Sequence, residues 1–321
     1  RRAFGSDGLG IILVSGIEGL NEKRNALLPL AKKFANLPDE VKEKYQDIAS
    51  GYQFGWSHGK EILAGGLPDY NKGSYYNNPL IDDPGGREGK DDRHPSFTTP
   101  NIWPKEMPEL QEGFMGLGSL MVEVGKLVAE ACDTLVVKEG RIGELGKLRR
   151  MVESSKSCKG RLLHYFPSKV LGLKGGEGGR VSPDGDGDFS GWCSWHNDRG
   201  TLTALVSAMY LDAESKEVNA CDVDPSVGLY IKSRAGVITQ ASILTLATPA
   251  PACQIGEAAQ IHSGGVLRAT AHAVKCARKE SMSRETFAVF MQPTQDEPLV
   301  LPQGVAIDEV ASTQLNNTSF I

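Results

Sequence analysis

The sequence predicts a mainly β fold with flanking helices, and two features of the chain carry that prediction. Apolar residues recur at helical spacing only in the first half, over about 22–35 and 108–135. Short β-prone segments dominate from residue 161 onward, including 202–210, 228–232 and the stretch after Arg284. We therefore expect a β core in the second half, supported by helices from the first half.

Length and composition restrict the class of protein. The 321 residues are 40% hydrophobic, which is enough for one large domain with a substantial core. A net charge of −5 without a basic cluster argues against nucleic acid as a partner. Apolar stretches are short and interrupted, so no membrane span is expected.

The six cysteines and the first residue bear on the compartment. The cysteines form no C-x-x-C pair, which favours reduced thiols in an intracellular protein over a zinc finger. The chain begins with Arg1 rather than Met, so a targeting peptide is compatible with this sequence. We expect a cytoplasmic protein that works as a monomer.

Aromatic residues interleaved with glycines mark two segments before residue 81. We interpret 51–60, which contains Trp56, and 69–80, which contains Tyr75 and Tyr76, as loops with large side chains to place. One interpretation is that these aromatics contact a substrate, and the other is that they pack the loops against the core. His58 lies in the first segment without a partner at metal-ligand spacing, which argues against a ligand role.

The chain is organised around His196-Asn197-Asp198. Residues i and i+2 of an extended strand point to the same side, so His196 and Asp198 can present an imidazole and a carboxylate to one ion. His272 lies far downstream as a third candidate ligand. Two histidines and one carboxylate form the facial triad of non-haem Fe(II) oxygenases, which leaves metal positions open. The alternative is that the three polar residues only satisfy hydrogen bonds inside a β fold.

A second pair follows the distal histidine. Arg284 offers a planar guanidinium that suits a carboxylate, and Thr286 adds a hydroxyl two residues further on the same strand face. A hydrophobic strand continues to Pro293.

The order H-x-D, then His, then R-x-T resembles the Fe(II)/2-oxoglutarate-dependent dioxygenases, in particular the isopenicillin-N-synthase-like branch. Two other segments resemble this branch. His164-Tyr165-Phe166-Pro167 is similar to its Asn-Tyr-Tyr-Pro strand, and residues 256–265 are similar to the turn before its distal histidine. That second similarity selects His272 over His262 as the ligand.

The resemblance implies a fold and a division of the chain. The fold is a distorted double-stranded β-helix (jelly roll) core with N-terminal helices. Residues 1–155 would form the N-terminal supporting region, 156–295 the jelly-roll core and 296–321 a C-terminal tail. The metal ligands would be His196, Asp198 and His272, with no further catalytic residue.

The resemblance also implies the cofactors: Fe(II), 2-oxoglutarate as co-substrate, and O₂, with ascorbate as an optional reductant. Arg284, Thr286 and Tyr165 are the candidate contacts to 2-oxoglutarate. The sequence departs from the family where Phe166 replaces the second Tyr, which removes one expected hydroxyl. Adjacent strand residues face opposite ways, which argues against Tyr165 as its substitute.

The implied activity is the oxidation of a small molecule by hydroxylation, desaturation or oxidative cyclisation. Secondary metabolism is favoured, and kainoid-type ring closure is one example. The candidate substrate contacts are Trp56, Tyr75, Tyr76, Arg199, Tyr230 and Arg268. Two alternatives remain: an Fe(II) oxidase of the same fold that needs no 2-oxoglutarate, and a jelly-roll binding module without catalysis.

Overall fold

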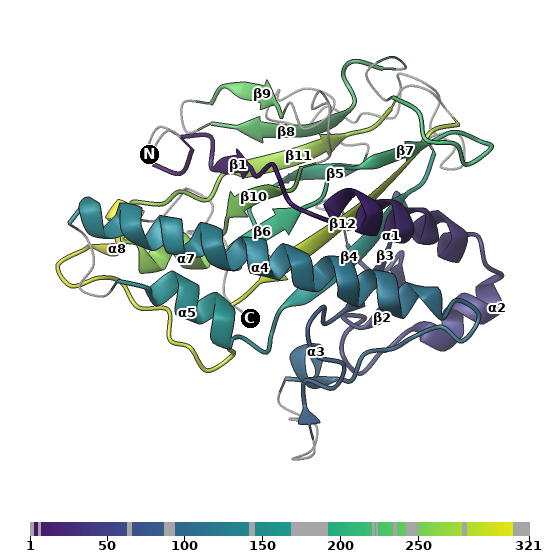
Figure 1. Cartoon of the computed structure of the whole chain (residues 1–321), viewed down its shortest axis with the longest axis horizontal. Coiled ribbons are helices and arrows are strands. Elements are labelled where there is room, and N and C mark those ends of the chain that lie inside the picture. Colours follow the sequence, from purple (N-terminus) through teal and green to yellow (C-terminus); the bar gives the residue numbers. More distant parts are fainter. Residues whose placement is uncertain are drawn as a thin grey trace.

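A computed structural model of the chain shows two antiparallel β-sheets with helices on one side (Figure 1). It describes residues 3–5, 8–62, 66–86, 94–140, 145–167, 192–219, 222, 224–233, 236–241, 250–277 and 281–310. The last part of the predicted C-terminal tail, residues 311–321, lies outside the described residues. The predicted bounds of the three regions stay a prediction.

The larger sheet has eight strands, and three of them come from the N-terminal region. Its order is β1 (Ile11–Leu13), β10 (Ala252–Ile255), β6 (Leu202–Leu205), β12 (Ser283–Met291), β4 (Lys159–Tyr165), β3 (Lys72–Asn77) and β2 (Gly55–His58), and β7 (Met209–Leu211) also pairs with β12. The segment predicted as β-prone over 202–210 is therefore two strands, β6 and β7.

The smaller sheet has four strands, in the order β5 (Cys193–His196), β11 (Ala271–Lys275), β8 (Gly228–Lys232) and β9 (Ile238–Gln240). All strand pairings in both sheets are antiparallel. Two facing antiparallel sheets with N-terminal helices are the predicted jelly-roll architecture, and the fold prediction is confirmed.

The helices are mostly N-terminal, as predicted. They are α1 (Leu20–Ala35), α2 (Asp39–Lys42), η1 (Glu43–Tyr45), α3 (Pro95–Thr98), α4 (Glu109–Lys138), α5 (Lys147–Ser154), α7 (Glu257–His262) and α8 (Ile307–Val310). Pro29 lies inside α1 and does not end it. No helix in the described ranges is both long and apolar enough to cross a membrane.

The two aromatic segments interpreted as loops contain the strands β2 and β3, which corrects that interpretation. Gly73 explains how their large side chains fit, because a Cβ at this position would lie 2.1 Å from the ring of Trp56. The glycine thus makes room for the indole of the neighbouring strand. Among the interleaved glycines, which indicated loops in the sequence, Gly73 is a place of close packing between β2 and β3.

One face of the larger sheet is apolar and packs against the helices, and we call it the outer face. Phe287 of β12 is fully buried there, with its ring centroid 4.8 Å from that of Phe114 on α4. Phe34 of α1 packs on the same face. Figure 1 shows α4 lying across this side of the sheet. Burying large aromatic side chains in this layer is a main source of the fold's stability.

The opposite, inner face carries the polar side chains, because successive residues of a strand alternate between faces. Tyr165 of β4 is paired in register with Lys72 of β3 on one side and with Arg284 of β12 on the other. Directly opposed residues share a face, so these three side chains form one row on the inner face. The smaller sheet packs on this face through Leu229 and Val274.

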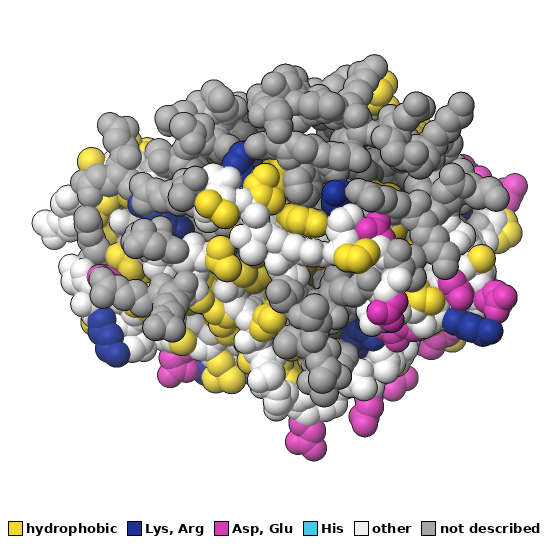
Figure 2. All heavy atoms as spheres, turned by 90° about the horizontal axis from the view of Figure 1, so that it is seen from above, with side chains coloured by type: hydrophobic (Ala, Val, Ile, Leu, Met, Phe, Trp, Pro, Cys, Tyr) yellow, Lys and Arg dark blue, Asp and Glu magenta, His cyan; other side chains and the backbone are white. Residues whose placement is uncertain are grey.

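The surface seen from above has its apolar side chains gathered towards the middle, with acidic side chains along one rim (Figure 2). Lys and Arg side chains are scattered singly over the part of this face that is described.

Candidate metal and co-substrate site

Two histidines lie side by side on adjacent strands of the smaller sheet. His196 ends β5 and His272 is the second residue of β11, and the two are direct register partners. Their ring centroids are 4.2 Å apart. The pairing therefore brings together two imidazoles from distant parts of the sequence.

Both histidines have the same local hydrogen bond. Nδ1 of His196 lies 2.8 Å from the backbone oxygen of Ser194, and Nδ1 of His272 lies 3.2 Å from that of Thr270. A carbonyl oxygen only accepts hydrogen bonds, so each Nδ1 carries a proton, and Nε2 is the nitrogen that can bind a metal when the imidazole is neutral. This tautomer is the one that metal-binding histidines use.

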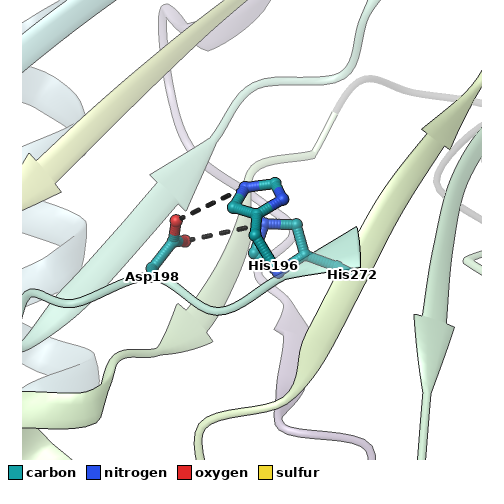
Figure 3. A group of neighbouring side chains, drawn as sticks. All are labelled: His196, Asp198 and His272. Carbon is teal, nitrogen blue, oxygen red and sulfur yellow. Dashed lines mark ion pairs between the residues drawn. The ribbon is translucent and has the colours of Figure 1, made fainter. Parts of the chain in front are cut away.

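Asp198 faces both Nε2 atoms, as Figure 3 shows. Its Oδ1 is 4.0 Å from Nε2 of His196, and its Oδ2 is 3.8 Å from Nε2 of His272. One ligand atom from each of the three residues lies within 4.8 Å of the others. These separations exceed hydrogen-bond length, and they leave room for an ion between the three groups.

Close backbone packing holds the loop that carries Asp198. The backbone oxygen of Asp198 accepts a hydrogen bond of 2.8 Å from the backbone nitrogen of Glu257, at the start of α7. A Cβ at Gly256 would lie 2.0 Å from the backbone oxygen of Gly200, so only glycine fits there. The loop therefore presents Asp198 from a fixed position.

The donor set fits a divalent metal. Asp198 Oδ2 is buried and accepts no hydrogen bond from any described residue. Burial, the largest influence, lowers the pKa of His272, which favours the neutral imidazole that a metal needs. Burial also acts to lower the pKa of His196, but the Cys193 sulphur and the Asp198 carboxylate outweigh it and raise that pKa to about 9. Metal binding at His196 would therefore displace a proton.

Arg284 presents an unpaired guanidinium on the inner face of the larger sheet. Its Nε and Nη1 are buried and donate no hydrogen bond to any described residue. Its guanidinium carbon lies 5.0 Å from the ring centroid of Tyr165. Leaving these donors unpaired is costly, and a bound carboxylate would satisfy them. Thr286 faces the same way, and its hydroxyl donates a hydrogen bond of 3.3 Å to the backbone oxygen of Val206.

Tyr165, and not Phe166, faces the predicted 2-oxoglutarate site. Phe166 packs towards the outer face, with its ring 4.5 Å from that of His164. His164 faces outward as well, where its Nδ1 lies 2.8 Å from Oε2 of the buried Glu285. The alternation that argued against Tyr165 in the sequence therefore places it beside Arg284. Its role as a co-substrate contact stays a prediction.

Only one of the three aromatic substrate candidates faces the interior between the sheets. Tyr76 is paired with Arg161 on the inner face. Trp56 and Tyr75 lie on the outer face, where their ring centroids are 5.2 and 4.9 Å from that of Phe34. Their placement supports the packing interpretation for these two residues.

The remaining substrate candidates are not brought together with the metal ligands. Arg199 is exposed, directly after Asp198. Tyr230 is paired with Ala273, on the opposite side of the smaller sheet from His272, and its hydroxyl donates to the backbone oxygen of Ser226 at 2.7 Å. Arg268 is half-buried in the segment before β11.

Three charged residues near the site were missed in the sequence. Lys72 is buried and Arg161 is half-buried on the inner face, and Glu61 forms an ion pair with each of them. The alternation Lys72-x-Ser74-x-Tyr76 was the available signal, because it places three polar side chains on one face of a strand. The interpretation of this segment as a loop concealed it.

Comparisons with known proteins bear on the family and the fold. Residues 1–106 match the family model described as the N-terminal region of the non-haem dioxygenase in morphine synthesis. No curated protein sequence matches the chain. The predicted resemblance to the Fe(II)/2-oxoglutarate-dependent dioxygenases is confirmed, and the isopenicillin-N-synthase-like branch is compatible with the match.

Several solved structures share this fold. A 2OG-Fe(II) oxygenase family protein from Caulobacter crescentus is 21% identical, with 95% of this chain and 83% of that chain covered and a TM-score of 0.65. A full-length Neurospora crassa protein, solved in complex with alpha-KG and 5-formyluracil, is 20% identical, with 96% and 82% covered and a TM-score of 0.62. The rice dioxygenase for auxin oxidation is 18% identical, with 95% and 81% covered and a TM-score of 0.54. The predicted enzyme class and its cofactors agree with these likenesses in fold.

Proposed function

We propose that the protein is a non-haem Fe(II)/2-oxoglutarate-dependent oxygenase that oxidises a small molecule. The observation that carries the proposal is that a set of metal ligands and an arginine with unsatisfied N–H donors face the same interior between the two sheets. His196, Asp198 and His272 offer three ligand atoms around a space for a metal. On the facing sheet, Arg284 offers a carboxylate two buried N–H donors that no described residue satisfies.

In this proposal each residue holds either the metal or 2-oxoglutarate. His196, Asp198 and His272 would hold Fe(II), which with 2-oxoglutarate supplies the activation of O₂. Arg284 would bind the carboxylate of 2-oxoglutarate that is remote from the metal, with Thr286 and Tyr165 beside it. The buried inner face excludes water, which strengthens the interaction between the guanidinium and the carboxylate.

The proposal covers hydroxylation, desaturation and oxidative cyclisation, because all three begin with oxidation at a C–H bond of the substrate. A place in secondary metabolism, including a kainoid-type ring closure, belongs to the same proposal. So do a monomeric state and a cytoplasmic location.

The test is the anaerobic addition of Fe(II) and 2-oxoglutarate to metal-free protein. We expect a visible metal-to-ligand charge-transfer band and, once O₂ is admitted, formation of succinate. Iron binding without the band would favour an oxidase that needs no 2-oxoglutarate. No iron binding would favour the binding module without catalysis, and would contradict the proposal.

A further inference from the structure

The larger sheet extends further than the sheet that faces it. Beyond β4 it continues through β3 to β2, whereas the smaller sheet ends at β5. Trp192, directly before β5, packs on Tyr165 of β4 with 5.5 Å between ring centroids, so β5 lies over β4. Within the described ranges, no strand of the smaller sheet therefore covers the inner face of β3.

Two cations, one buried and one half-buried, lie on the inner face at this edge. Lys72 of β3 and Arg161 of β4 point to the same side, because Lys72 is paired with Tyr165 and Arg161 with Tyr76. The Cys193 sulphur of β5 acts to raise the pKa of both side chains. The Cys193 sulphur is 3.8 Å from Nδ1 of His196, which connects the two cations to the metal site.

A carboxylate already bridges these cations. Glu61 pairs with Nη2 of Arg161 through Oε1 and with Nζ of Lys72 through Oε2, the latter at 3.1 Å. Tyr76 donates its hydroxyl hydrogen to Oε1 of Glu61 at 2.9 Å. Asp69 is a second partner of Lys72. The arrangement shows that a carboxylate fits between the two side chains.

The guanidinium of Arg161 is held rigidly and keeps one open end. Its Nε and Nη2 donate to the hydroxyl oxygen of Ser74 at 3.0 and 2.9 Å, and its carbon lies 4.9 Å from the ring centroid of Tyr76. Its Nη1 donates to no residue that the structure describes. A fixed guanidinium with a free N–H end suits a carboxylate oxygen, since little side-chain freedom is lost on binding.

Burial makes this edge favourable for an anion. The side chains of Lys72 and Arg161 are 6% and 16% exposed, whereas that of Glu61 is 41% exposed. Water screens the carboxylate of Glu61 more than it screens the cations. Asp69 is 2% exposed and pairs with Lys72, so the less balanced positive charge is that of Arg161, whose carboxylate partner is the exposed Glu61.

We propose that Arg161, supported by Lys72, is the specificity-determining residue for the substrate and binds the carboxylate of a small organic acid. This inference rests on the proposed function, in which Arg284 is occupied by 2-oxoglutarate. The substrate carboxylate would lie against the inner face of β3, which no described strand of the smaller sheet covers. Glu61, Ser74 and Tyr76 are positioning residues, because each fixes Arg161 or Lys72.

The test uses full-length protein loaded anaerobically with Fe(II) and 2-oxoglutarate. Benzoate, phenylacetate and N-acetylated amino acids are titrated against the charge-transfer band and the Tm, each alongside its primary amide. We expect at least one acid to act at about tenfold lower concentration than its amide, since a charge-assisted hydrogen bond is the stronger one. In Arg161→Gln this preference should disappear, while the affinity for 2-oxoglutarate stays unchanged.

Two further variants keep the result interpretable. Arg161→Lys retains the charge without the planar fork and should keep part of the acid preference. Arg149→Gln, on the surface of α5, removes an arginine that pairs with Glu130 and should leave the preference unchanged. Equal action of acids and amides, no acid that acts, or a preference that survives Arg161→Gln would each overturn the inference. A missing band before any acid is added would instead reject the proposed function.

Discussion

The two faces of the larger sheet are built from the same strands and do different work. On β12, Phe287 points to the helices and is fully buried among aromatic rings, whereas its neighbour Thr286 points to the interior between the sheets. On β4, Leu162 faces the helices, and Arg161 and Tyr165 face the metal side. Because successive side chains of a strand point to opposite faces, one strand contributes alternately to the apolar core and to the polar interior between the sheets.

The comparison also shows how each face treats charge. The outer face contains a buried pair, His164 and Glu285, in which Ser283 donates a further hydrogen bond of 2.8 Å to the carboxylate. On the inner face, the buried donors of Arg284 are left open. The polar pair of the outer face is satisfied within the chain, whereas the inner face, besides its own ion pairs, carries donors that no described residue satisfies.

The largest expected effect is on the metal. His272→Ala removes one of three ligands, and we expect Fe(II) affinity to fall by a factor of about 100 or more, because even residues that only orient a ligand contribute 10–100-fold. Titration of metal-free protein with Fe(II) measures this. His262→Ala is the matched control, since His262 is buried on α7 outside the metal cluster and should retain iron binding. Equal losses in both variants would contradict the ligand assignment.

On the outer face, Phe287→Ala should destabilise the fold without changing the site. We expect a loss of about 3–5 kcal/mol in the free energy of unfolding, because a large cavity forms against Phe114. Urea unfolding measures this loss. At low temperature the folded variant should bind 2-oxoglutarate as the unchanged protein does. Weaker binding of 2-oxoglutarate by fully folded Phe287→Ala would contradict the assignment of separate tasks to the two faces.

On the inner face, Arg284→Ala should weaken the binding of 2-oxoglutarate rather than destabilise the fold. It leaves the 2-oxoglutarate carboxylate without its partner, and we expect Kd to rise about a hundredfold, or about 3 kcal/mol. Arg284→Lys should recover part of this affinity, because it keeps the charge but not the fork. Titration of the charge-transfer band in the Fe(II) protein gives both values. The assignment fails if the two variants behave alike.

The smallest expected effect concerns Lys159, which begins β4. Its Nζ donates to the backbone oxygens of Gln53 and Ser96 at 2.9 and 2.8 Å and lies 3.5 Å from the ring centroid of Phe54. Burial lowers its pKa to about 7. Below that pH the lysine is protonated in both folded and unfolded chains. Above it the folded chain loses the proton first, so stability should rise with pH until the unfolded lysine titrates.

This rise should amount to about 1–2 kcal/mol between pH 7 and 8.5, by the linkage between pKa and stability. Thermal unfolding at several pH values compares the unchanged protein with Lys159→Met. The variant should lack this part of the pH dependence. A pH profile identical in both proteins would show that Lys159 stays charged when folded.

The sequence predicted the elements whose signals are local. The helices near 22–35 and 108–135 and the His196–Asp198 pair each follow from spacing within a few residues. The β core and its jelly-roll class followed from the ordered motifs. The geometry then brought His272 to the other two candidate ligands.

The sequence did not predict what depends on register. Glycines next to Trp56 and Tyr75 indicated loops, whereas Gly73 permits close packing of two strands. The direction of Tyr165 depends on its partners Lys72 and Arg284, which are distant in the sequence. The cluster around Arg161 depends on three separate segments, so no single motif contains it.

Because His196 is the direct register partner of His272, binding of iron at this site would depend on the correct register between β5 and β11. A slip of one residue between β5 and β11 would turn one imidazole away from the other and abolish the metal position. Only the correctly assembled chain would then bind the ion, and binding would stabilise the folded state against unfolding by mass action. Iron supply during synthesis would therefore select the correctly assembled form as well as enabling catalysis.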